Sequence, residues 1–563
     1  KKYAWLALIC IGVEVVLEIM VPKLMADLID IGVTNSDVPY IINKGIQMAV
    51  CAVAALILGV GSARFSALAG QGLGANIRKA EYEKLQSYSF SNIDHFSVSS
   101  LVTRLTSDVT NIQNAVSTGM RPFGRSPVML IFATTLAFKI NSTLALVFLV
   151  ALPVLAVLLI IIIINVGPRY GRMQGAVDLV NRCIEENLTA VRVVKSYVRG
   201  DYEIEKFRNV NDNLKNESEK AFGIAVLNMP AMQFVMYSTI LGILLIGGRL
   251  INSGQMMIGQ LTSFLSYVLL ILNSLMMMSN VFLLMTRSLA SAERIMKVID
   301  EPIDITDENA RNIEVKKGEI EFNHVWFKYN ETAKEYVLSD VSFHINAGQT
   351  VGIIGQTGSS KTTLIQLIPR LYDASKGEIK IDGINVKEYP VRHLRDAISV
   401  VLQKNTLFSG SLIDNLRWGN ENATLDEIKE ACSIACVDEF IDRLPGGFDA
   451  EMGQEGVNVS GGQKQRICIA RAILKKPKVL ILDDSTSAVD TATEGKIRNA
   501  LAKKLPDMTK IIIAQRISSV RHADQIIIMD GGCVNAIGTH ESLLKTNKIY
   551  QEIYESQKEG ADL

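Results

Sequence analysis

Long apolar runs recur along the first half of the chain, up to about residue 290. A helix needs about 20 such residues to cross about 30 Å of hydrocarbon. The fourth run, from Leu144 to Ile164, is the clearest because it contains the uninterrupted stretch Ile160–Ile164, whereas Arg and Pro residues interrupt the third and fifth. The pattern predicts six membrane spans, at about residues 5–30, 46–70, 120–139, 144–165, 226–249 and 260–286.

The pattern changes near residue 300. Segment 301–318 is polar and rich in acidic residues, which is typical of a linker. Beyond it, short β-branched runs alternate with amphipathic helical stretches, as in an α/β domain. We therefore predict an α-helical six-span transmembrane domain at 1–300, a linker at 301–318 and an α/β domain at 319–563.

Basic residues distinguish the two sides of the membrane. The loop after the second span holds Arg78, Lys79, Lys84 and Arg104, and the loop after the fourth holds ten more between Arg169 and Lys220. The positive-inside rule then places both loops and both termini in the cytoplasm, and it explains these cations without nucleic acid. Both loops keep helical spacing, so we expect the spans to continue as helices and to present a distant turn to a soluble domain.

Composition fits a multi-pass membrane protein in contact with lipid: 48% of the 563 residues are hydrophobic, 21% are charged, and the mean hydropathy is +0.22. Lys+Arg and Asp+Glu both number 58, and this zero net charge argues against a nucleic-acid partner. The seven cysteines show no zinc spacing, and we interpret them as small apolar residues in a reducing cytosol. No signal peptide is visible, and because the chain begins at Lys1 without Met we expect residues before it.

A phosphate-binding loop follows the buried-strand pattern Thr350–Ile354. It reads Gly355, Gln356, Thr357, Gly358, Ser359, Ser360, Lys361, Thr362 and Thr363, and then a helix continues. Backbone N–H groups of such a P-loop hold phosphate oxygens, the Lys361 ammonium reaches the β- and γ-phosphates, and the Thr362 hydroxyl binds Mg²⁺. The α/β domain is thus predicted to bind ATP with Mg²⁺.

Two further segments belong to this chemistry. The apolar strand Val479–Asp483 ends in a carboxylate, the expected place for an acid that acts on Mg²⁺. A second anion site lies at a helix start formed by Ser460, Gly461, Gly462 and Gln463. A single copy of the domain cannot easily bring both the P-loop and this second anion site onto the same nucleotide. We therefore predict two such domains, head to tail, each completing the ATP site of the other.

These motifs, VSGGQKQR at 459–466, ILDDSTSAVD at 481–490 and the six-span layout, closely resemble those of ATP-binding cassette (ABC) exporters of the half-transporter type. The resemblance covers essentially the whole chain and implies a bacterial inner-membrane exporter. It implies that Tyr329 stacks on adenine, that Gln403 senses Mg²⁺ and faces the membrane domain, and that Ser460–Gln463 form the signature loop. It also implies that 487–490 link the two ATP sites and that 92–104 and 198–207 are coupling helices.

Three departures from the family's pattern fall in the site of this chain's own P-loop. Ser360 stands where Gly is usual, and its Cβ crowds the approach to phosphate. Asp484 replaces the usual catalytic Glu, which retracts the carboxylate by roughly 1 Å. Gln515 replaces the switch His and cannot be protonated. The signature loop is intact, although the segment before it has Glu455 in place of the usual Arg.

The three departures resemble those of the degenerate-site subunit in a heterodimeric multidrug exporter. This predicts a different partner half-transporter that carries the consensus Glu and His. Hydrolysis would take place mainly at the partner's P-loop site, which the signature loop of this chain completes. Two alternatives remain open: a homodimer that hydrolyses ATP slowly with Asp484, and a nucleotide-gated channel or regulator.

The predicted cargo is an amphipathic drug, with lipid or peptide as the alternative. Candidate cargo residues are Glu14, Glu18, Met232, Met277 and Phe282. Intramembrane carboxylates need a cavity, water or a polar partner, so Glu14 and Glu18 can equally be structural partners of Arg121 and Arg125. Methionine suits a promiscuous apolar cavity, but ordinary packing explains it as well.

Overall fold

The computed structural model describes residues 2–484 and 489–559, apart from the side chains of residues 148, 149, 152, 156, 159, 162, 163, 228, 279, 280, 282, 283, 286 and 287. The chain divides into two compact units. The first comprises Lys1–Lys84 and Ser99–Asp300, and the second comprises Leu85–Val98 and Glu301–Leu563.

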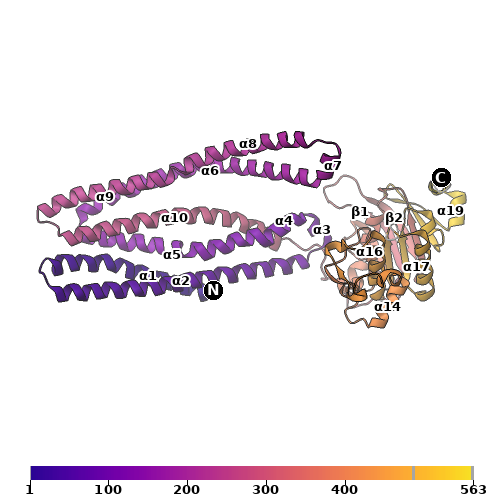
Figure 1. The fold of residues 1–563 in the computed structure, drawn as a ribbon. Helices are drawn as coiled ribbons and strands as arrows, with labels where there is room; N and C mark the ends of the chain where they lie inside the picture. Colours follow the sequence, from indigo (N-terminus) through magenta and orange to yellow (C-terminus); the bar gives the residue numbers. More distant parts are fainter. Residues whose placement is uncertain (1, 485–488, 560–563) are drawn as a thin grey trace. The chain divides into compact units, whose positions relative to one another are not determined.

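The first unit is a bundle of long helices (Figure 1). They continue beyond the predicted spans because the polar loop residues keep helical spacing with few breakers. The elements of this unit are α1 (Lys2–Asp27), η1 (Leu28–Val33), α2 (Val38–Gln86), α4 (Val98–Thr103), η2 (Arg104–Asp108), α5 (Val109–Ile140), α6 (Ser142–Thr189), α7 (Val191–Ser196), α8 (Gly200–Ala225), α9 (Asn228–Asn252) and α10 (Ile258–Ile299).

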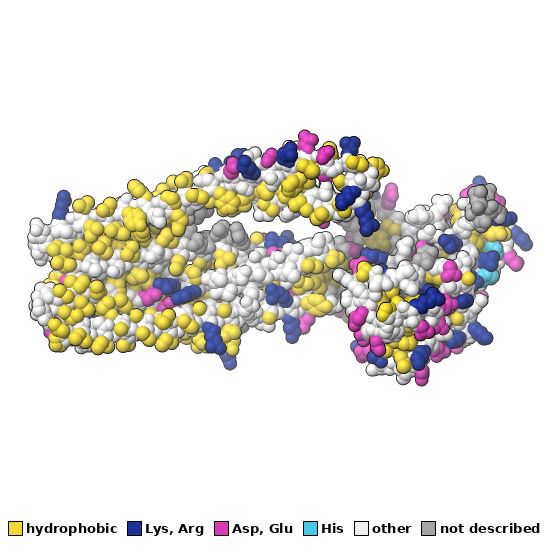
Figure 2. Space-filling model, in the orientation of Figure 1, with side chains coloured by type: hydrophobic (Ala, Val, Ile, Leu, Met, Phe, Trp, Pro, Cys, Tyr) yellow, Lys and Arg dark blue, Asp and Glu magenta, His cyan; other side chains and the backbone are white. Residues whose placement is uncertain are grey.

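Five helical segments in the described part of the chain are long and apolar enough to cross a membrane: Lys2–Val33, Val38–Gln86, Val98–Ile140, Gly200–Asn252 and Ile258–Met278. The predicted fourth span lies in α6, where several side chains are outside the described residues, so the count of six stays a prediction. Figure 2 shows hydrophobic side chains over α1, α2 and α9, as expected for lipid contact, whereas charged side chains gather over α8.

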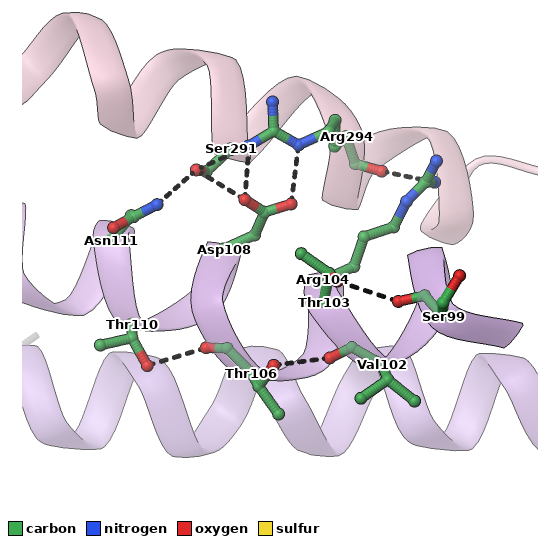
Figure 3. A network of polar contacts seen from close by, with 10 residues as sticks. All are labelled: Ser99, Val102, Thr103, Arg104, Thr106, Asp108, Thr110, Asn111, Ser291 and Arg294. Atoms are coloured by element: carbon green, nitrogen blue, oxygen red, sulfur yellow. Dashed lines mark hydrogen bonds and ion pairs between the residues drawn. The ribbon is translucent and has the colours of Figure 1, made fainter. Parts of the chain in front are cut away.

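A polar network ties the start of α5 to the end of α10 (Figure 3). The buried carboxylate of Asp108 accepts hydrogen bonds from Arg294 Nε at 2.8 Å and from Ser291 Oγ at 2.9 Å. Arg104 Nη1 donates to the carbonyl of Arg294 at 2.9 Å, and Asn111 Nδ2 donates to Ser291 Oγ at 3.1 Å. Removing one partner of this network would leave a buried charge uncompensated, which is costly. The network therefore helps to keep the start of α5 in contact with the end of α10.

Glu81 lies beside this network, on the part of α2 that extends beyond the predicted span 46–70. Its side chain is fully buried, and neither carboxylate oxygen has a hydrogen-bond partner among the described residues. Burial raises the pKa of Glu81 to about 7, while the charge of Arg104 opposes this shift and that of Asp108 adds to it. Because the pKa is higher in the folded state than in the unfolded state, ionised Glu81 destabilises the fold above pH 7, and this penalty disappears as the pH falls to the unfolded pKa.

Glu81→Gln is expected to stabilise the purified protein at pH 8 by up to about 3 kcal/mol, because the amide carries no charge to desolvate. The gain should shrink as the pH is lowered from 7 toward 4.5, which thermal melts across that range would measure. Glu83→Gln is the matched control, because the Glu83 side chain on the same helix is 66% exposed. If the stability gained by Glu81→Gln does not change with pH, the charge of ionised Glu81 is not the cause of the destabilisation.

The second unit contains two large sheets (Figure 1). A six-stranded sheet has the order β12-β11-β3-β10-β9-β6 and is parallel except for the β11–β12 pair, and a four-stranded antiparallel sheet has the order β2-β1-β4-β5. The strands are β1 (Ile320–Phe327), β2 (Leu338–Ile345), β3 (Thr350–Ile354), β4 (Lys376–Ile381), β5 (Ile384–Asn385), β6 (Ile398–Val401), β7 (Gly410–Ser411), β8 (Glu451–Met452), β9 (Val479–Asp483), β10 (Thr509–Ile513), β11 (Gln525–Asp530) and β12 (Cys533–Gly538). The strands predicted at 350–354 and 479–483 are confirmed as β3 and β9.

Strand β9 shows how this sheet is buried on both faces. Val479 and Ile481 belong to a core shared with the four-stranded sheet, while Leu480 and Leu482 belong to a core formed with helices on the opposite face. The helices of this unit are α3 (Phe90–Asp94), α11 (Lys361–Leu367), α12 (Val391–Asp396), α13 (Leu412–Arg417), α14 (Leu425–Ile434), α15 (Asp438–Ile441), α16 (Gly461–Leu474), α17 (Thr491–Lys504), α18 (Ile517–Val520), α19 (His540–Thr546) and α20 (Lys548–Glu559), with short 3₁₀ turns η3 (Val386–Glu388), η4 (Gly447–Asp449) and η5 (Gln454–Gly456).

Helix α3 comes from the loop after α2 but packs within the second unit. Ser89 caps it through a capping box with Asn92. Tyr372 Oη donates to Asp94 Oδ2 at 2.7 Å, and Asn92 Nδ2 donates to the carbonyl of Pro302 at 2.8 Å. The segment 92–104, expected to form one coupling helix, is therefore divided, because residues from Ser99 onward belong to the first unit.

Candidate active site

The P-loop joins β3 to α11 at the carboxyl edge of the parallel sheet, where α/β folds bind ligands. A Cβ on Gly355 would lie 2.2 Å from the carbonyl oxygen of Met529, so only glycine fits there. Ser360, the N-cap of α11, has φ 66° and ψ 23°. This left-handed conformation costs a residue with a Cβ about 1 kcal/mol relative to glycine. The structure thus gives a second physical reason, besides crowding, why glycine would suit this position.

Lys361 points back into its own loop. Its Nζ donates to the carbonyls of Gly355 at 2.9 Å and Gln356 at 2.8 Å, and to Ser359 Oγ at 3.1 Å. Burial lowers the pKa of Lys361, and the charges of Asp483 and Asp484 oppose this shift. Phosphate oxygens would replace these three neutral acceptors with charged ones, which form stronger hydrogen bonds with an ammonium group.

Thr362 and Asp483 form a pair of oxygen donors suited to Mg²⁺. Thr362 Oγ1 donates to Asp483 Oδ1 at 3.3 Å, and the Asp483 side chain is buried at the end of β9. Burial raises the pKa of Asp483, and the bond from Thr362 opposes this shift. Hydroxyl and carboxylate oxygens are hard ligands that Mg²⁺ accepts while keeping several waters. Gln403, the third predicted Mg²⁺ residue, lies exposed in the loop that follows β6.

Asp484 and Gln515, two of the three replaced positions, are in direct contact. Gln515 Nε2 donates to Asp484 Oδ2 at 3.0 Å. Asp484 has φ 47°, a left-handed conformation that is strained for a non-glycine residue. Burial raises the pKa of Asp484, although Lys361, Arg516 and Gln515 lower it. The structure therefore brings the predicted catalytic carboxylate and the predicted switch residue together at the ends of β9 and β10.

The signature loop begins α16, a 14-residue helix that packs on α13 and α14. Ser460 and Gln463 form a capping box, in which Gln463 N donates to Ser460 Oγ at 3.3 Å and Ser460 N donates to Gln463 Oε1 at 2.8 Å. The first backbone N–H groups of α16, at Gly461 and Gly462, are not blocked by long side chains. This end of the helix is a ready anion site.

Tyr329 stands beside the P-loop helix. Its hydroxyl lies 2.9 Å from Thr363 Oγ1, and its ring meets those of Phe327 and Tyr372 edge-on, with centroids 4.9 and 5.2 Å away. The side chain remains 48% exposed, so part of the ring is open to a ligand, and an aromatic ring is suited to stacking on a base. Of the predicted linking segment 487–490, residues 487 and 488 lie outside the described residues.

Two contacts within this unit could not be predicted from the sequence. One is the docking of α3 onto Tyr372, and the other joins Gln557 of α20 to the backbone around Gln515. Both connect residues far apart in the chain. No local motif predicts either contact. The amphipathic pattern of α20 was the one available signal, because it indicates which face of the helix is buried and therefore how its polar side chains near the site are oriented.

Comparison with known proteins then identifies the family. The ABC transporter transmembrane region matches residues 4–275, and the ABC transporter domain matches residues 338–487. YfiB, an uncharacterized ABC transporter ATP-binding protein of Bacillus subtilis, is 38% identical over 561 residues, which are 99% of this chain and 97% of that protein. The chain belongs to the ABC transporter family.

Other relatives of this ABC transporter differ in the cargo that their names state. A putative multidrug export protein of B. subtilis, YgaD, is 32% identical over 86% of this chain and 83% of its own length. An ATP-dependent lipid A-core flippase of Desulfotalea psychrophila is 32% identical over 87% and 85%. A bacterial Atm1-family ABC exporter with ATP bound has the same fold, with TM-score 0.86, 21% identity and coverage of 99% and 98%. This chain is thus a multi-pass, ATP-driven ABC exporter with a cytoplasmic ATPase domain.

The predicted cargo residues of the exporter have different environments. Arg121 Nη2 and Arg125 Nη2 donate at 2.6 Å to the carboxylates of Glu14 and Glu18, respectively. Both acids also line a cavity of about 760 Å³ formed by α1, α2, α5 and α10. Met232 is buried in the bundle core and Met277 is 44% exposed. The side chain of Phe282 lies outside those that the structure describes.

Ser360→Gly is expected to strengthen ATP binding by this ABC transporter about fivefold. The substitution removes the Cβ beside the bound phosphates, and relief of about 1 kcal/mol of crowding there corresponds to this factor. The left-handed conformation of Ser360 is present without nucleotide, so its cost affects the stability of the fold and not ATP binding. Ser360→Ala keeps the Cβ and removes only the hydroxyl, so it should give no gain. Titration of the purified protein with ATP would measure both variants, and equal affinities for Gly and Ala would contradict the role given to the Cβ.

Proposed function

We propose that this chain is the degenerate-site half of a heterodimeric exporter of amphipathic drugs. Its own P-loop site binds ATP and hydrolyses it slowly or not at all. Its signature loop completes the competent site of a different half-transporter, which carries the consensus Glu and His. ATP binding at both sites closes the two ATPase domains, and hydrolysis at the partner's site reopens them.

The observation that carries this proposal is the grouping of the three replaced residues. Asp484 and Gln515 contact each other at 3.0 Å, and Ser360 precedes the P-loop lysine whose charge acts on Asp484. The signature loop, in contrast, keeps its Ser and both Gly residues with an intact capping box. Drift at unrelated positions would not concentrate in one ATP site while sparing the segment that serves the other.

The replacements at Asp484 and Gln515 each have a defined physical consequence for hydrolysis. A catalytic carboxylate must reach the attacking water, and a displacement of about 1 Å can slow such a step about 100-fold. Asp484 is one methylene shorter than Glu, and its Oδ2 already accepts a bond from Gln515. The Gln515 amide can donate a hydrogen bond to a γ-phosphate, but it cannot act as a cation. ATP can therefore be bound and sensed here with little hydrolysis.

The Mg²⁺ that accompanies ATP fits the donor pair already described. Thr362 and Asp483 would hold the ion with their hydroxyl and carboxylate oxygens. When bound, it neutralises charge that develops on the phosphates. Lys361 and the backbone N–H groups of the P-loop would orient the phosphates, and Tyr329 would hold the adenine.

Coupling to the membrane helices is proposed to use α3 and the turn between α7 and α8. Helix α3 already packs within the ATPase unit through Asp94 and Tyr372. At the other turn, Tyr197 and Val198 are 75% and 88% exposed, which is unusual for apolar side chains at the end of a polar helical pair. We expect this turn to pack against the ATPase domain of the partner half-transporter.

A lipid is the second candidate cargo, because one relative is named as a lipid A-core flippase. The ion pairs of Glu14 and Glu18 leave their cavity without a large uncompensated charge. This favours amphiphiles of varied headgroup over strongly cationic molecules alone. Vectorial, ATP-dependent efflux of an amphipathic dye or a labelled lipid from vesicles would distinguish the two cargo classes and would separate both from a channel.

Affinity purification of this chain from its native host, followed by native mass spectrometry, tests the proposal directly. A 1:1 complex with a different half-transporter that carries Glu and His at the equivalent positions is expected. A dimer of this chain alone would overturn the heterodimer. Asp484 would then serve at both sites, and the protein would be a slow ATPase.

A further inference from the structure

The C-terminal helix α20 is firmly anchored on the ATPase domain. Tyr550 is fully buried, and its hydroxyl lies 2.8 Å from His540 Nδ1 in α19. Ile553 and Tyr554 follow on the same face and pack against the main core of the unit. Gln557 lies one further turn along this face, since residues separated by three or four positions share a side of a helix. The anchored helix therefore determines where the Gln557 amide points.

Gln557 uses both ends of its amide on the segment that follows β10. Its Nε2 donates to the carbonyl of Gln515 at 2.8 Å, and its Oε1 accepts from the backbone N–H of Ile517 at 2.8 Å. The two contacts flank Arg516 and leave the intervening backbone little freedom to rotate. A single side chain thus holds the backbone of Gln515 from outside the ATP site.

The local sequence does not provide this support itself. Ile517 begins the four-residue helix α18, and the N-cap residue Arg516 makes no side-chain capping bond. The Gln557 Oε1 satisfies an N–H group that would otherwise lack a partner at this helix start. Gln515, held in this way, extends its own amide to Asp484 Oδ2 at 3.0 Å. Hydrogen bonds to the backbone and from the side chain of Gln515 therefore connect α20 to the Asp484 carboxylate.

We propose that Gln557 is a positioning residue for the switch glutamine, and that α20 thereby sets the contact of Gln515 with the γ-phosphate of ATP. This rests on the proposed role of Gln515 at the γ-phosphate. ADP lacks the γ-phosphate, so the contribution of Gln557 is specific to ATP. A purely structural contribution of α20 would affect both nucleotides alike.

The test uses the intact transporter and labels this chain with 8-azido-ATP in the cold, in competition with ATP or ADP. Gln557→Met keeps the length of the side chain and removes both hydrogen bonds. It should require about fivefold more ATP for half-competition and the same ADP, since one hydrogen bond contributes about 1 kcal/mol. Gln551→Met is the matched control, because Gln551 in the same helix donates to the carbonyl of Leu544 at 2.7 Å instead. It should change neither value.

Gln515→Ala distinguishes a failure of the proposed role of Gln515 from a failure of the positioning role of Gln557. If it leaves competition by ATP unchanged, the proposed role of Gln515 is wrong and the role of Gln557 is wrong with it. If it weakens ATP competition but Gln557→Met does not, only the positioning role is overturned. Equal losses for ATP and ADP in Gln557→Met, or the same loss in Gln551→Met, would also overturn it.

Discussion

Ser460→Ala is expected to lower the ATPase activity of the intact transporter about 100-fold, the typical effect of removing one preorganised donor to a developing anionic transition state. The Ser460 hydroxyl caps α16 and, in the proposed dimer, faces the γ-phosphate bound by the partner's P-loop. That site carries out most of the hydrolysis in our proposal. Phosphate release by the purified complex in lipid would measure the loss.

Two controls make this prediction specific. Thr424→Ala removes an equivalent capping box from α14, where Glu427 N donates to Thr424 Oγ1 at 3.3 Å, so it reproduces the loss of a cap, about 1 kcal/mol, away from any nucleotide. It should leave the ATPase activity largely intact. Asp484→Asn should lower the activity far less than Ser460→Ala, because little hydrolysis takes place beside Asp484 in the proposed mechanism. Equal losses of ATPase activity for Ser460→Ala and Asp484→Asn would contradict the asymmetric mechanism.

The double substitution Asp484→Glu with Gln515→His is expected to raise hydrolysis at this chain's own site about 100-fold, the rate that a misplacement of about 1 Å can cost. Both residues must change together. Gln515 Nε2 lies 3.0 Å from Asp484 Oδ2, so the longer Glu side chain alone would meet the amide that Asp484 now contacts. The histidine removes that amide and supplies a group that can be protonated near neutral pH.

This gain is best measured with hydrolysis at the partner's site disabled, so that the remaining ATPase activity reports on Asp484 and Gln515. The single variants Asp484→Glu and Gln515→His serve as controls and should each gain much less than the pair. A double variant as slow as the native chain would show that neither residue limits hydrolysis. The low activity proposed for this site would then have to arise from Ser360 or from the signature loop that the partner contributes.

Motifs of consecutive residues were the part of the site that could be predicted. The P-loop, the strand ending in Asp483 and the signature loop were located because their chemistry is carried by neighbours in the chain, and the predicted strands coincide with β3 and β9. The contact between Asp484 and Gln515 could not be predicted from spacing, since 31 positions separate them. It forms because β9 and β10 are adjacent parallel strands whose carboxyl ends meet at one edge of the sheet.

The transmembrane helices show a similar limit. Hydropathy located the apolar spans, and helical spacing in the loops correctly predicted that α2 and α6 continue well beyond them, for totals of 49 and 48 residues. It could not reveal that Asp108 pairs with Arg294, 186 positions away, or that Glu81 is buried beside them with no hydrogen-bond partner in the described part of the chain. Periodicity reports which face of a helix is apolar, but it does not report which other helix lies against that face.

The sequence by itself determined the ABC transporter family, the order of the domains and the three departures at one ATP site, because each is written in contiguous residues or in local periodicity. Only the tertiary structure decided how the residues contact one another. It shows the left-handed backbone of Ser360, the hydrogen bond between Asp484 and Gln515, the packing of α3 on Tyr372 and the hydrogen bond of Gln557 to the backbone of Gln515. These depend on packing between elements distant in the chain, where a single hydrogen bond leaves no periodic trace in the sequence.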